Sequence, residues 1–492
     1  MFKRIINITI WTLIGLYTAI IILLHIPSIQ TYIGGCVADA LCDKFGTKVK
    51  VGRVDLGFIN RLILDDSYMQ DKNGEQMLRV SRISVKINLL ALANGQIEIT
   101  SAQFFGLHAN LYKATPEAKP NFQFVVDALA SKDSTKQKTP LDLQINSLII
   151  RNGEISYRVL SRPSRPGKFS ADDINACNIS AHIIINRITD DSLNVKVKRI
   201  AFDERCGFKL KSLSLSAIAC RTKTKIENFK LELPATLIQI PSLQASYRMK
   251  NGQIEMPTLQ FAGSIKAPYI SPSDLAVFVP TLTRLNMRPA LDIQFNGTGS
   301  SLTVKKISIN TTDGSLQLVA NGGVKNYPAN PSWYTNIDQL KAGQQAISNI
   351  YAVATGKNVP NIIERLGNVQ ITGYAGGDKK NIASEGKLHT SPGNLTLAFD
   401  KRGDKITAHM ETVRFNIGSL VNDNKLGHIS ANLNVHGSSK DNFAAQGRVY
   451  DFDYNGYKYR SLNLNATYRN KQLEGKANID DPNVQLTAIG TF

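Results

Sequence analysis

The sequence predicts a mainly β protein in which one N-terminal transmembrane helix precedes a single long, twisted and curved antiparallel β-sheet, shaped as a groove and flanked by a few helices. Three observations predict this class. An uncharged apolar run occupies residues 5–24. From residue 47 onward, apolar side chains alternate with polar ones, as on half-buried strands. Asn-Gly and Asp-Gly pairs, which supply the positive φ angles of tight hairpins, recur between these segments.

Residues 1–26 predict a cytoplasmic tip and an uncleaved signal anchor. A helix of about 20 residues reaches about 30 Å, enough to cross the hydrocarbon of a bilayer. Lys3 and Arg4 precede the apolar run, whereas residues 26–43 contain no Lys or Arg. This asymmetry places the N-terminus in the cytoplasm and the rest of the chain across the membrane. The residues expected to hold the anchor in the bilayer are Ile5, Trp11, Leu13, Leu16, Ile21 and Leu24.

Two alternatives to the anchor stay open. A cleaved signal peptide has a shorter apolar core, of about 7–15 residues, with a small-residue cleavage site close behind it. Here the nearest such triplet is at 38–40, well beyond the run. Lipidation at Cys36 is the second alternative, but Pro27 and Tyr32 separate this cysteine from the apolar run. The length of the run favours the anchor.

The chain is strongly basic, with 58 Lys and Arg against 39 Asp and Glu and a formal net charge of +19. The basic residues are mostly single and alternate with apolar ones, so nucleic acid is not expected as a partner. Solvated strand faces and attraction to lipid headgroups account for the charge. The five cysteines lack metal-ligand spacing, so no metal and no other cofactor is expected. A Cys206–Cys220 disulfide stays open.

The segments that follow the anchor are predicted in turn. Residues 27–46 predict an amphipathic helix, because apolar side chains recur every fourth residue until Gly46. This helix is expected to plug the end of the sheet or to lie on the membrane surface. Residues 47–130 predict an N-terminal β-repeat that ends in a short helix, and residues 131–140 a polar loop. Residues 141–492 predict the continuing groove, with helices near 271–285 and 340–366.

Short turns are expected to join the strands. They are predicted at the pairs 73–74, 94–95, 152–153, 251–252, 313–314, 321–322 and 455–456. A string of small sandwiches would show a linker about every 100 residues, and only residues 131–140 look like one. A single long sheet therefore remains, and its apolar face needs something to fill it.

No arrangement of residues predicts catalysis. None of the seven histidines stands in a metal-binding or nucleophile motif. Adjacent carboxylates such as Asp65 and Asp66 point to opposite faces of a strand and are typical of turns rather than of a catalytic pair. The chain is therefore expected not to be an enzyme.

Several stretches in residues 1–130 resemble AsmA-like proteins, and among them the TamB-like inner-membrane subunits of the translocation and assembly module. A membrane helix and an amphipathic helix come first. Strand and turn phrases then follow at residues 46–54 (GTKVKVGRV), 62–66 (LILDD), 71–74 (DKNG), 80–87 (VSRISVKI), 94–99 (NGQIEI), 105–112 (FGLHANLY) and 121–124 (NFQF). Beyond residue 130 the resemblance is architectural and consists only of the pattern of alternating strands.

The resemblance implies a function that involves no catalysed reaction. It implies an inner-membrane protein with its bulk in the periplasm, whose β-groove conducts phospholipids between the inner and outer membranes and supports outer-membrane biogenesis. It further implies an outer-membrane barrel of the Omp85 type as a protein partner. The alternative is a non-enzymatic scaffold that assembles or translocates outer-membrane proteins by offering an exposed sheet edge to their strands.

The candidate lipid-groove residues are apolar side chains at alternate positions of their strands, which place them on one face of the sheet. The alternative is that they are ordinary core residues packed under a helix or a second sheet. An error of one residue in parity would move a whole strand to the other face. The candidates are Leu213, Leu215, Ile293, Phe295, Leu316, Leu318, Leu395 and Leu397.

Overall fold

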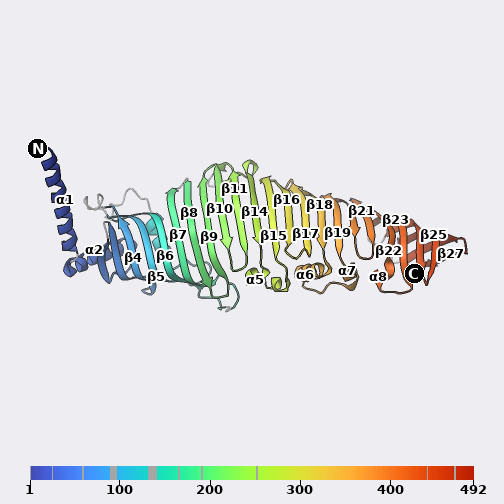
Figure 1. Ribbon diagram of the computed structural model, residues 1–492, viewed down its shortest axis with the longest axis horizontal. Helices are drawn as coiled ribbons and strands as arrows, with labels where there is room; N and C mark the ends of the chain where they lie inside the picture. Colours follow the sequence, from blue (N-terminus) through green and yellow to red (C-terminus); the bar gives the residue numbers. More distant parts are fainter. Residues whose placement is uncertain are drawn as a thin grey trace. The chain divides into compact units, whose positions relative to one another are not determined.

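The computed structural model describes the chain except for residues 1, 25, 58–59, 89–96, 131–140, 165–166, 190–191, 251–252, 440–441, 470–471 and 492. The described residues divide into two compact units, residues 1–220 with 228–234 and residues 221–227 with 235–492 (Figure 1). Strand β10 (Lys223–Glu232) contributes residues to both units. The prediction of a mainly β chain with antiparallel strands dominant and few helices is confirmed.

The first unit begins with two helices, α1 (Phe2–Leu24) and α2 (Pro27–Phe45). Helix α2 ends at Gly46, whose φ of 59° is left-handed and whose N–H donates to the Cys42 carbonyl. A further helix, α4 (Gln123–Ala130), lies between β5 and β6. The strands are β1 (Val49–Lys50), β2 (Arg53–Gly57), β3 (Arg61–Gln70), β4 (Gln76–Ile87), β5 (Ile97–Lys113), β6 (Leu141–Val159), β7 (Asp173–Thr189), β8 (Ser192–Glu204) and β9 (Lys209–Cys220).

Within the described residues, no helix is both long enough and apolar enough to cross a membrane. The segment predicted as an anchor is helical as α1. Of the residues expected in the bilayer, Trp11 and Leu16 are exposed. The side chains of the others lie outside the described residues, namely Ile5, Leu13, Ile21 and Leu24. The membrane anchor therefore stays a prediction.

The second unit carries most of its strands in hairpin order. Its strands are β11 (Leu237–Ser246), β12 (Met249–Lys250), β13 (Gln253–Ile254), β14 (Gln260–Tyr269), β15 (Pro289–Thr298), β16 (Ser301–Thr311), β17 (Leu316–Lys325), β18 (Ser332–Ala342), β19 (Val369–Gly377), β20 (Asn381–His389), β21 (Asn394–Arg402), β22 (Lys405–Asn416), β23 (Leu426–Ser439), β24 (Asn442–Tyr454), β25 (Tyr457–Arg469), β26 (Gln472–Asp481) and β27 (Val484–Thr491). Its helices are η1 (Met256–Thr258), α5 (Pro272–Leu275), η2 (Pro280–Arg284), α6 (Gln344–Thr355), α7 (Asn361–Glu364) and α8 (Ile417–Val421).

One strand pair departs from the predicted antiparallel order. Strands β5 and β6 run parallel, with Phe104 opposite Ile150. Parallel neighbours need a crossover connection of about a dozen residues or more. The segment from residue 114 to 140, which includes α4, supplies that length. The alternating pattern shows which face a side chain takes but not the direction of the neighbouring strand.

Two of the predicted turns lie inside strands instead. The pair 152–153 falls within β6, where Asn152 has a φ of 53° and the register with β7 shifts around Gly153. An Asn-Gly pair with positive φ serves here as a β-bulge, which bends a strand without reversing it. The pair 321–322 likewise falls within β17. The pairs 94–95 and 251–252 lie outside the described residues.

Candidate functional site

Cross-strand register aligns the apolar side chains of the second unit on one face. Residues that are directly opposite each other in an antiparallel pair share a face. Leu291 of β15 stands opposite Ile309, and Ile309 in turn stands opposite Leu318. The same row continues strand by strand through Leu340, Ile371, Leu388, Leu395, Thr412, Ala431, Val449, Leu462, Ile479 and Leu486.

The candidate groove residues of the second unit all lie on this apolar face. Ile293 and Phe295 follow Leu291 at alternate positions of β15, and Leu316 and Leu318 do the same on β17. On β21, Leu395 and Leu397 stand opposite Leu388 and Gly386. Residues of the opposite parity, such as Gln317 and Thr396, pair with Asn310 and Lys387 on the other face.

The two candidates of the first unit occupy its own apolar face. Leu215 stands opposite Val197, and Leu213 stands opposite Ile200. Val197 faces Ile183, which in turn faces Leu148 of β6. Leu148 packs against the buried cluster of this unit, formed by Val54, Leu62, Leu64, Val85 and Ala102.

Burial distinguishes this apolar face from an ordinary core. None of the eight candidate side chains is buried, and Leu397 keeps 37% of its surface exposed. A fully buried Leu gains about 1.5–3 kcal/mol relative to an exposed one, so side chains left half-covered forgo much of that free energy. Large exposed apolar surfaces on soluble proteins are typical of binding sites.

A hollow deepens the apolar face at strands β23–β27. Its volume is about 450 Å³, which lies within the range of small-ligand sites, roughly 300–1,000 Å³. Small side chains create it, because alanine and glycine stand where leucine and isoleucine stand elsewhere on the face. The lining includes Leu433, Val435, Ala445, Leu464, Ala466, Gly475, Ala477, Ala488 and Gly490. The sequence does show small residues at alternate positions in 475–477 and 488–490. The strand pattern alone, however, does not show that these two segments lie side by side.

Helix α2 covers one end of the apolar face of the first unit. Its Ile33 and Val37 pack against the buried cluster that contains Val54. Gly34 allows the close approach, since a Cβ there would lie 2.9 Å from Val54 Cγ2. On the same helix, the Gln30 Nε2 donates to the Asp55 carboxylate at 3.2 Å. Of the two predicted roles for this helix, the packing matches a plug.

Leucine at position 34 is expected to push α2 away from β2. Overpacking of this kind costs about 1–3 kcal/mol. The thiol of Cys42, which lies 3.2 Å from the Val49 backbone nitrogen, should then react faster with a thiol reagent. Gly35→Leu is the matched control, because a Cβ at Gly35 meets nothing within 4 Å. Equal labelling rates in the two variants would contradict the plug.

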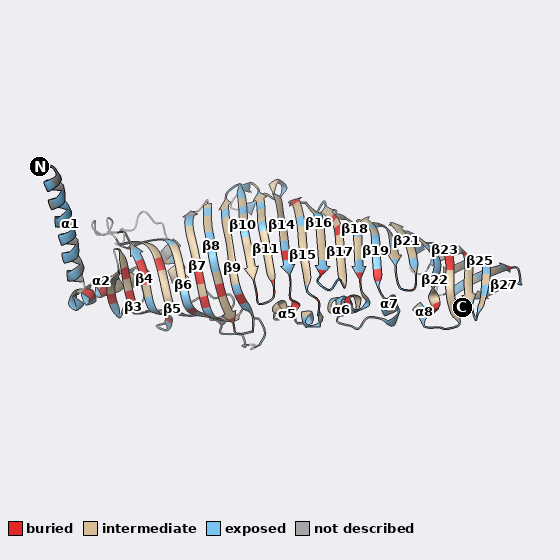
Figure 2. Ribbon diagram, in the orientation of Figure 1, coloured by how far each residue is buried: buried red, intermediate tan, exposed pale blue. Residues whose placement is uncertain are grey.

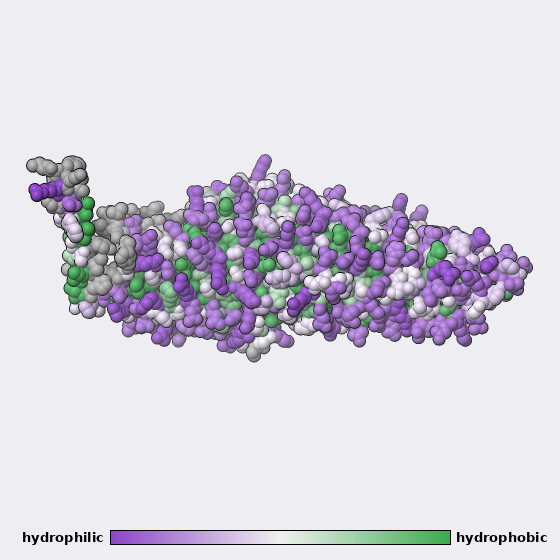
Figure 3. All heavy atoms as spheres, in the orientation of Figure 1, coloured by the Kyte–Doolittle hydropathy of each residue, from purple (hydrophilic) through white to green (hydrophobic). Residues whose placement is uncertain are grey.

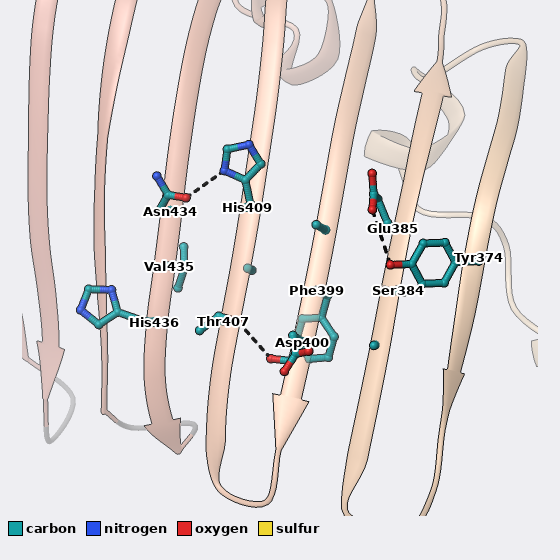
Figure 4. Close-up of a pocket in the computed structure, with 13 residues that line it drawn as sticks. Tyr374, Ser384, Glu385, Phe399, Asp400, Thr407, His409, Asn434, Val435 and His436 are labelled. Atoms are coloured by element: carbon teal, nitrogen blue, oxygen red, sulfur yellow. Dashed lines mark hydrogen bonds between the residues drawn. The ribbon is translucent and has the colours of Figure 1, made fainter. Parts of the chain in front are cut away.

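The opposite face of the second unit has a hollow of about 420 Å³, lined by both polar and apolar residues. Figure 4 shows His409 and Asn434 on neighbouring strands, with His409 Nδ1 and Asn434 Oδ1 2.8 Å apart. On another strand pair the Tyr374 hydroxyl donates to Glu385 at 3.5 Å. In Figure 4 these two pairs lie along the sheet rather than converging on one point, and the hollow offers hydrogen bonds to a polar ligand.

Comparison with known proteins leaves the family open. No family model matches the chain, and no curated protein and no solved structure matches it at a significant level. The resemblance to AsmA-like proteins over residues 1–130 therefore remains a prediction from the sequence.

Proposed function

We propose that this protein is a non-enzymatic conduit for phospholipids, related to the TamB-like branch of the AsmA-like proteins. The observation that carries the proposal is the half-exposed apolar face, on which the register aligns Ile293, Leu318 and Leu395. In this proposal α1 anchors the chain in the inner membrane with its N-terminus in the cytoplasm, and both units lie in the periplasm. The groove delivers lipid toward the outer membrane, where an Omp85-type barrel is the proposed protein partner.

The energetics of lipid transfer support the proposal. Moving an acyl chain of about 16 carbons into water costs about 0.8 kcal/mol per methylene, or roughly 12 kcal/mol per chain. An apolar strand face removes most of that cost while the headgroup stays in solvent. Such transfer needs no reacting group, only side chains of one parity on successive strands.

Photo-crosslinking in cells tests the proposal directly. A photoreactive residue is placed at Leu213, Leu316 or Leu397, and the attached molecule is identified by mass spectrometry. We expect phospholipid adducts at these positions, because their side chains lie on the apolar face. The matched control positions, one residue along each strand and on the opposite face, are Ser214, Gln317 and Thr396.

The outcomes separate the proposed conduit from its alternatives. Lipid adducts confined to the leucine positions would support the conduit. Outer-membrane protein adducts at these positions would favour the strand-templating scaffold. No adducts at the leucines would mean that these side chains form a core, and the conduit would have to be abandoned.

A further inference from the structure

The two long margins of the second unit are built differently. One margin, here called the helical margin, carries α5, α6, α7 and α8 in a row (Figure 1). The other, here called the open margin, consists of the short turns that join β15 to β16, β17 to β18, β19 to β20 and β21 to β22. These turns span residues 299–300, 326–331, 378–380 and 403–404, and none of their described residues is helical.

Burial on the apolar face follows this difference. At the helical margin, Ala342 and Val369 are buried, whereas Lys341 and Gln370 on the other face are exposed. The helical connection therefore covers the apolar side of the sheet. Ala431 of β23, the strand that contacts α8, is also fully buried, and Figure 2 marks the buried residues along the strands in red.

At the open margin the apolar face stays uncovered. Trp333 is 39% exposed and Leu302 is 38% exposed. Val324 lies on the apolar face, because it is an even number of residues along β17 from Leu318. Leu302 and Trp333 share this face, because both stand opposite Val324. An acyl chain on this face therefore meets solvent at the open margin and protein at the helical one.

A lysine interrupts the apolar row at this open margin. Trp333 stands opposite Gly377, and Gly377 stands opposite Ile382. Lys401 follows in the same row, between Ile382 and Ile406. A lysine stem can lie on apolar surface while its ammonium reaches water, and Trp with Lys is typical of the boundary between lipid chains and headgroups.

The ammonium group of Lys401 is available to bind an anionic group of a ligand. Its neighbours Asp400 and Arg402 pair with each other at 3.0 Å. Among the described residues no salt bridge joins Lys401 to a carboxylate. Lys380 in the β19–β20 turn and Lys405 at the start of β22 lie at the same margin, together with Asp378 and Asp404, and this margin is hydrophilic in Figure 3.

We propose that the open margin around Lys401 binds the phosphate of a phospholipid whose acyl chains lie on the apolar face beside Trp333. This site rests on the proposed conduit and adds a direction to it: the headgroup travels along the open margin, and the chain ends point toward the helical one. The apolar row selects an acyl chain, and the unpaired ammonium selects an anionic group at its end. Neither feature alone would select a phospholipid.

The chain supplies its own reporter for this site. Trp333 is one of two tryptophans, so Trp11→Phe leaves it as the only one. Three strand spacings of about 4.8 Å separate the strands of Trp333 and Lys401, or about 14 Å. Full-length Trp11→Phe protein is titrated in detergent with phosphatidylglycerol that carries bromine on its acyl chains, and quenching of Trp333 reports binding. Diacylglycerol with the same brominated chains is the phosphate-free probe.

We expect quenching by both lipids in the parent protein, with phosphatidylglycerol bound more tightly. Lys401→Gln should weaken phosphatidylglycerol about 5-fold, the effect of one lysine near an anionic headgroup, and should leave diacylglycerol unchanged. Lys387→Gln is the matched control, because Lys387 pairs with Thr396 on the other face of β20 and β21. It should change neither lipid.

Each other outcome overturns a stated part of the argument. If both lipids quench Trp333 and each binds Lys401→Gln as tightly as the parent, the headgroup site would be overturned and the conduit would stand. No quenching by either lipid would overturn the conduit and the site with it. If inorganic phosphate alone alters Trp333 fluorescence through Lys401, or displaces phosphatidylglycerol, then the ligand is free phosphate and the proposal fails.

Discussion

Phenylalanine at position 475 is expected to block lipid in the hollow of β23–β27 without unfolding the sheet. A Cβ at Gly475 would meet nothing within 4 Å, and the residue lines the hollow opposite Ala466. The new ring would take the space of about three methylene groups, each worth about 0.8 kcal/mol on burial. Lipid occupancy of this hollow should therefore fall at least about 10-fold, because no compensating space opens beside it.

The measurement is lipid crosslinked from position 464, quantified by mass spectrometry in the parent protein and in Gly475→Phe. Lys476→Phe is the matched control, because it adds the same ring one residue along β26 and on the opposite face, where Lys476 stands opposite Asn465. Thermal unfolding should be nearly the same in the variant and in its control. Undiminished lipid adducts in Gly475→Phe would show that acyl chains do not occupy the hollow.

Asp71→Ala is expected to destabilise the start of the first unit by about 3 kcal/mol, since several donors lose a charged acceptor at once. Asp71 is only 2% exposed. Its carboxylate accepts hydrogen bonds from the Tyr112 hydroxyl at 2.7 Å and the Asn121 amide at 3.3 Å. It also accepts the backbone N–H groups of Asn73 and Glu75. These bonds tie the β3–β4 turn to the end of β5.

The ionisation of Asp71 gives this prediction a pH dependence. Burial by itself raises the pKa of Asp71, but the hydrogen bonds from Tyr112, Asn121 and the backbone outweigh it and hold the pKa below the usual 3.8. A carboxyl with a lowered pKa stabilises the folded state fully above its unfolded pKa and loses that contribution as the pH falls through the folded pKa. The difference between parent and variant should therefore be full at neutral pH and shrink only below about pH 4.

Hydrogen exchange of β3, β4 and β5 measures the local effect, because a chain of this size need not unfold in one step. Tyr112→Phe is the graded control. It removes one donor and leaves the carboxylate its other partners, so a smaller effect is expected, of about 1 kcal/mol. Equal exchange in Asp71→Ala and the parent would show that the turn holds without its carboxylate.

The second unit repeats this arrangement at the β26–β27 turn. Asp481, which is 3% exposed, accepts from the Tyr457 hydroxyl at 2.6 Å and from the Asn483 backbone N–H at 2.9 Å. The Asn483 amide then donates to the Tyr457 oxygen at 3.0 Å, as the Asn73 amide does to Tyr112 at 2.9 Å. The same three residue types therefore clamp a hairpin turn to a neighbouring strand in both units.

Some of this protein could be predicted because the information is local. Alternation with a period of two decides that a segment is a strand and which side chains share its face. For this reason Leu316, Leu318 and Leu395 were placed on one face by parity alone. Turns with a carboxylate or amide beside glycine, such as Asp313-Gly314, are equally local. Gly46 ended helix α2 as expected, because glycine readily adopts the left-handed conformation that caps the helix here.

Other features depended on residues far apart in the sequence. The parallel pairing of β5 with β6 and the bulge at Asn152 follow from which strand the chain returns to, and the Asn-Gly signal is the same for a turn and a bulge. The hollow at Gly475 exists because small side chains of the four strands β24–β27 meet there.

The sequence by itself determined the strands, the parity of their apolar side chains and the helix that ends at Gly46, because each is set by spacing within about 20 residues. Only the tertiary structure decided that one margin of the apolar face is covered by helices and the other is open. It also decided that Lys401 stands in the apolar row between Ile382 and Ile406. The physical reason is register: the hydrogen-bond ladder between strands fixes which side chains become neighbours, and no single strand carries that information.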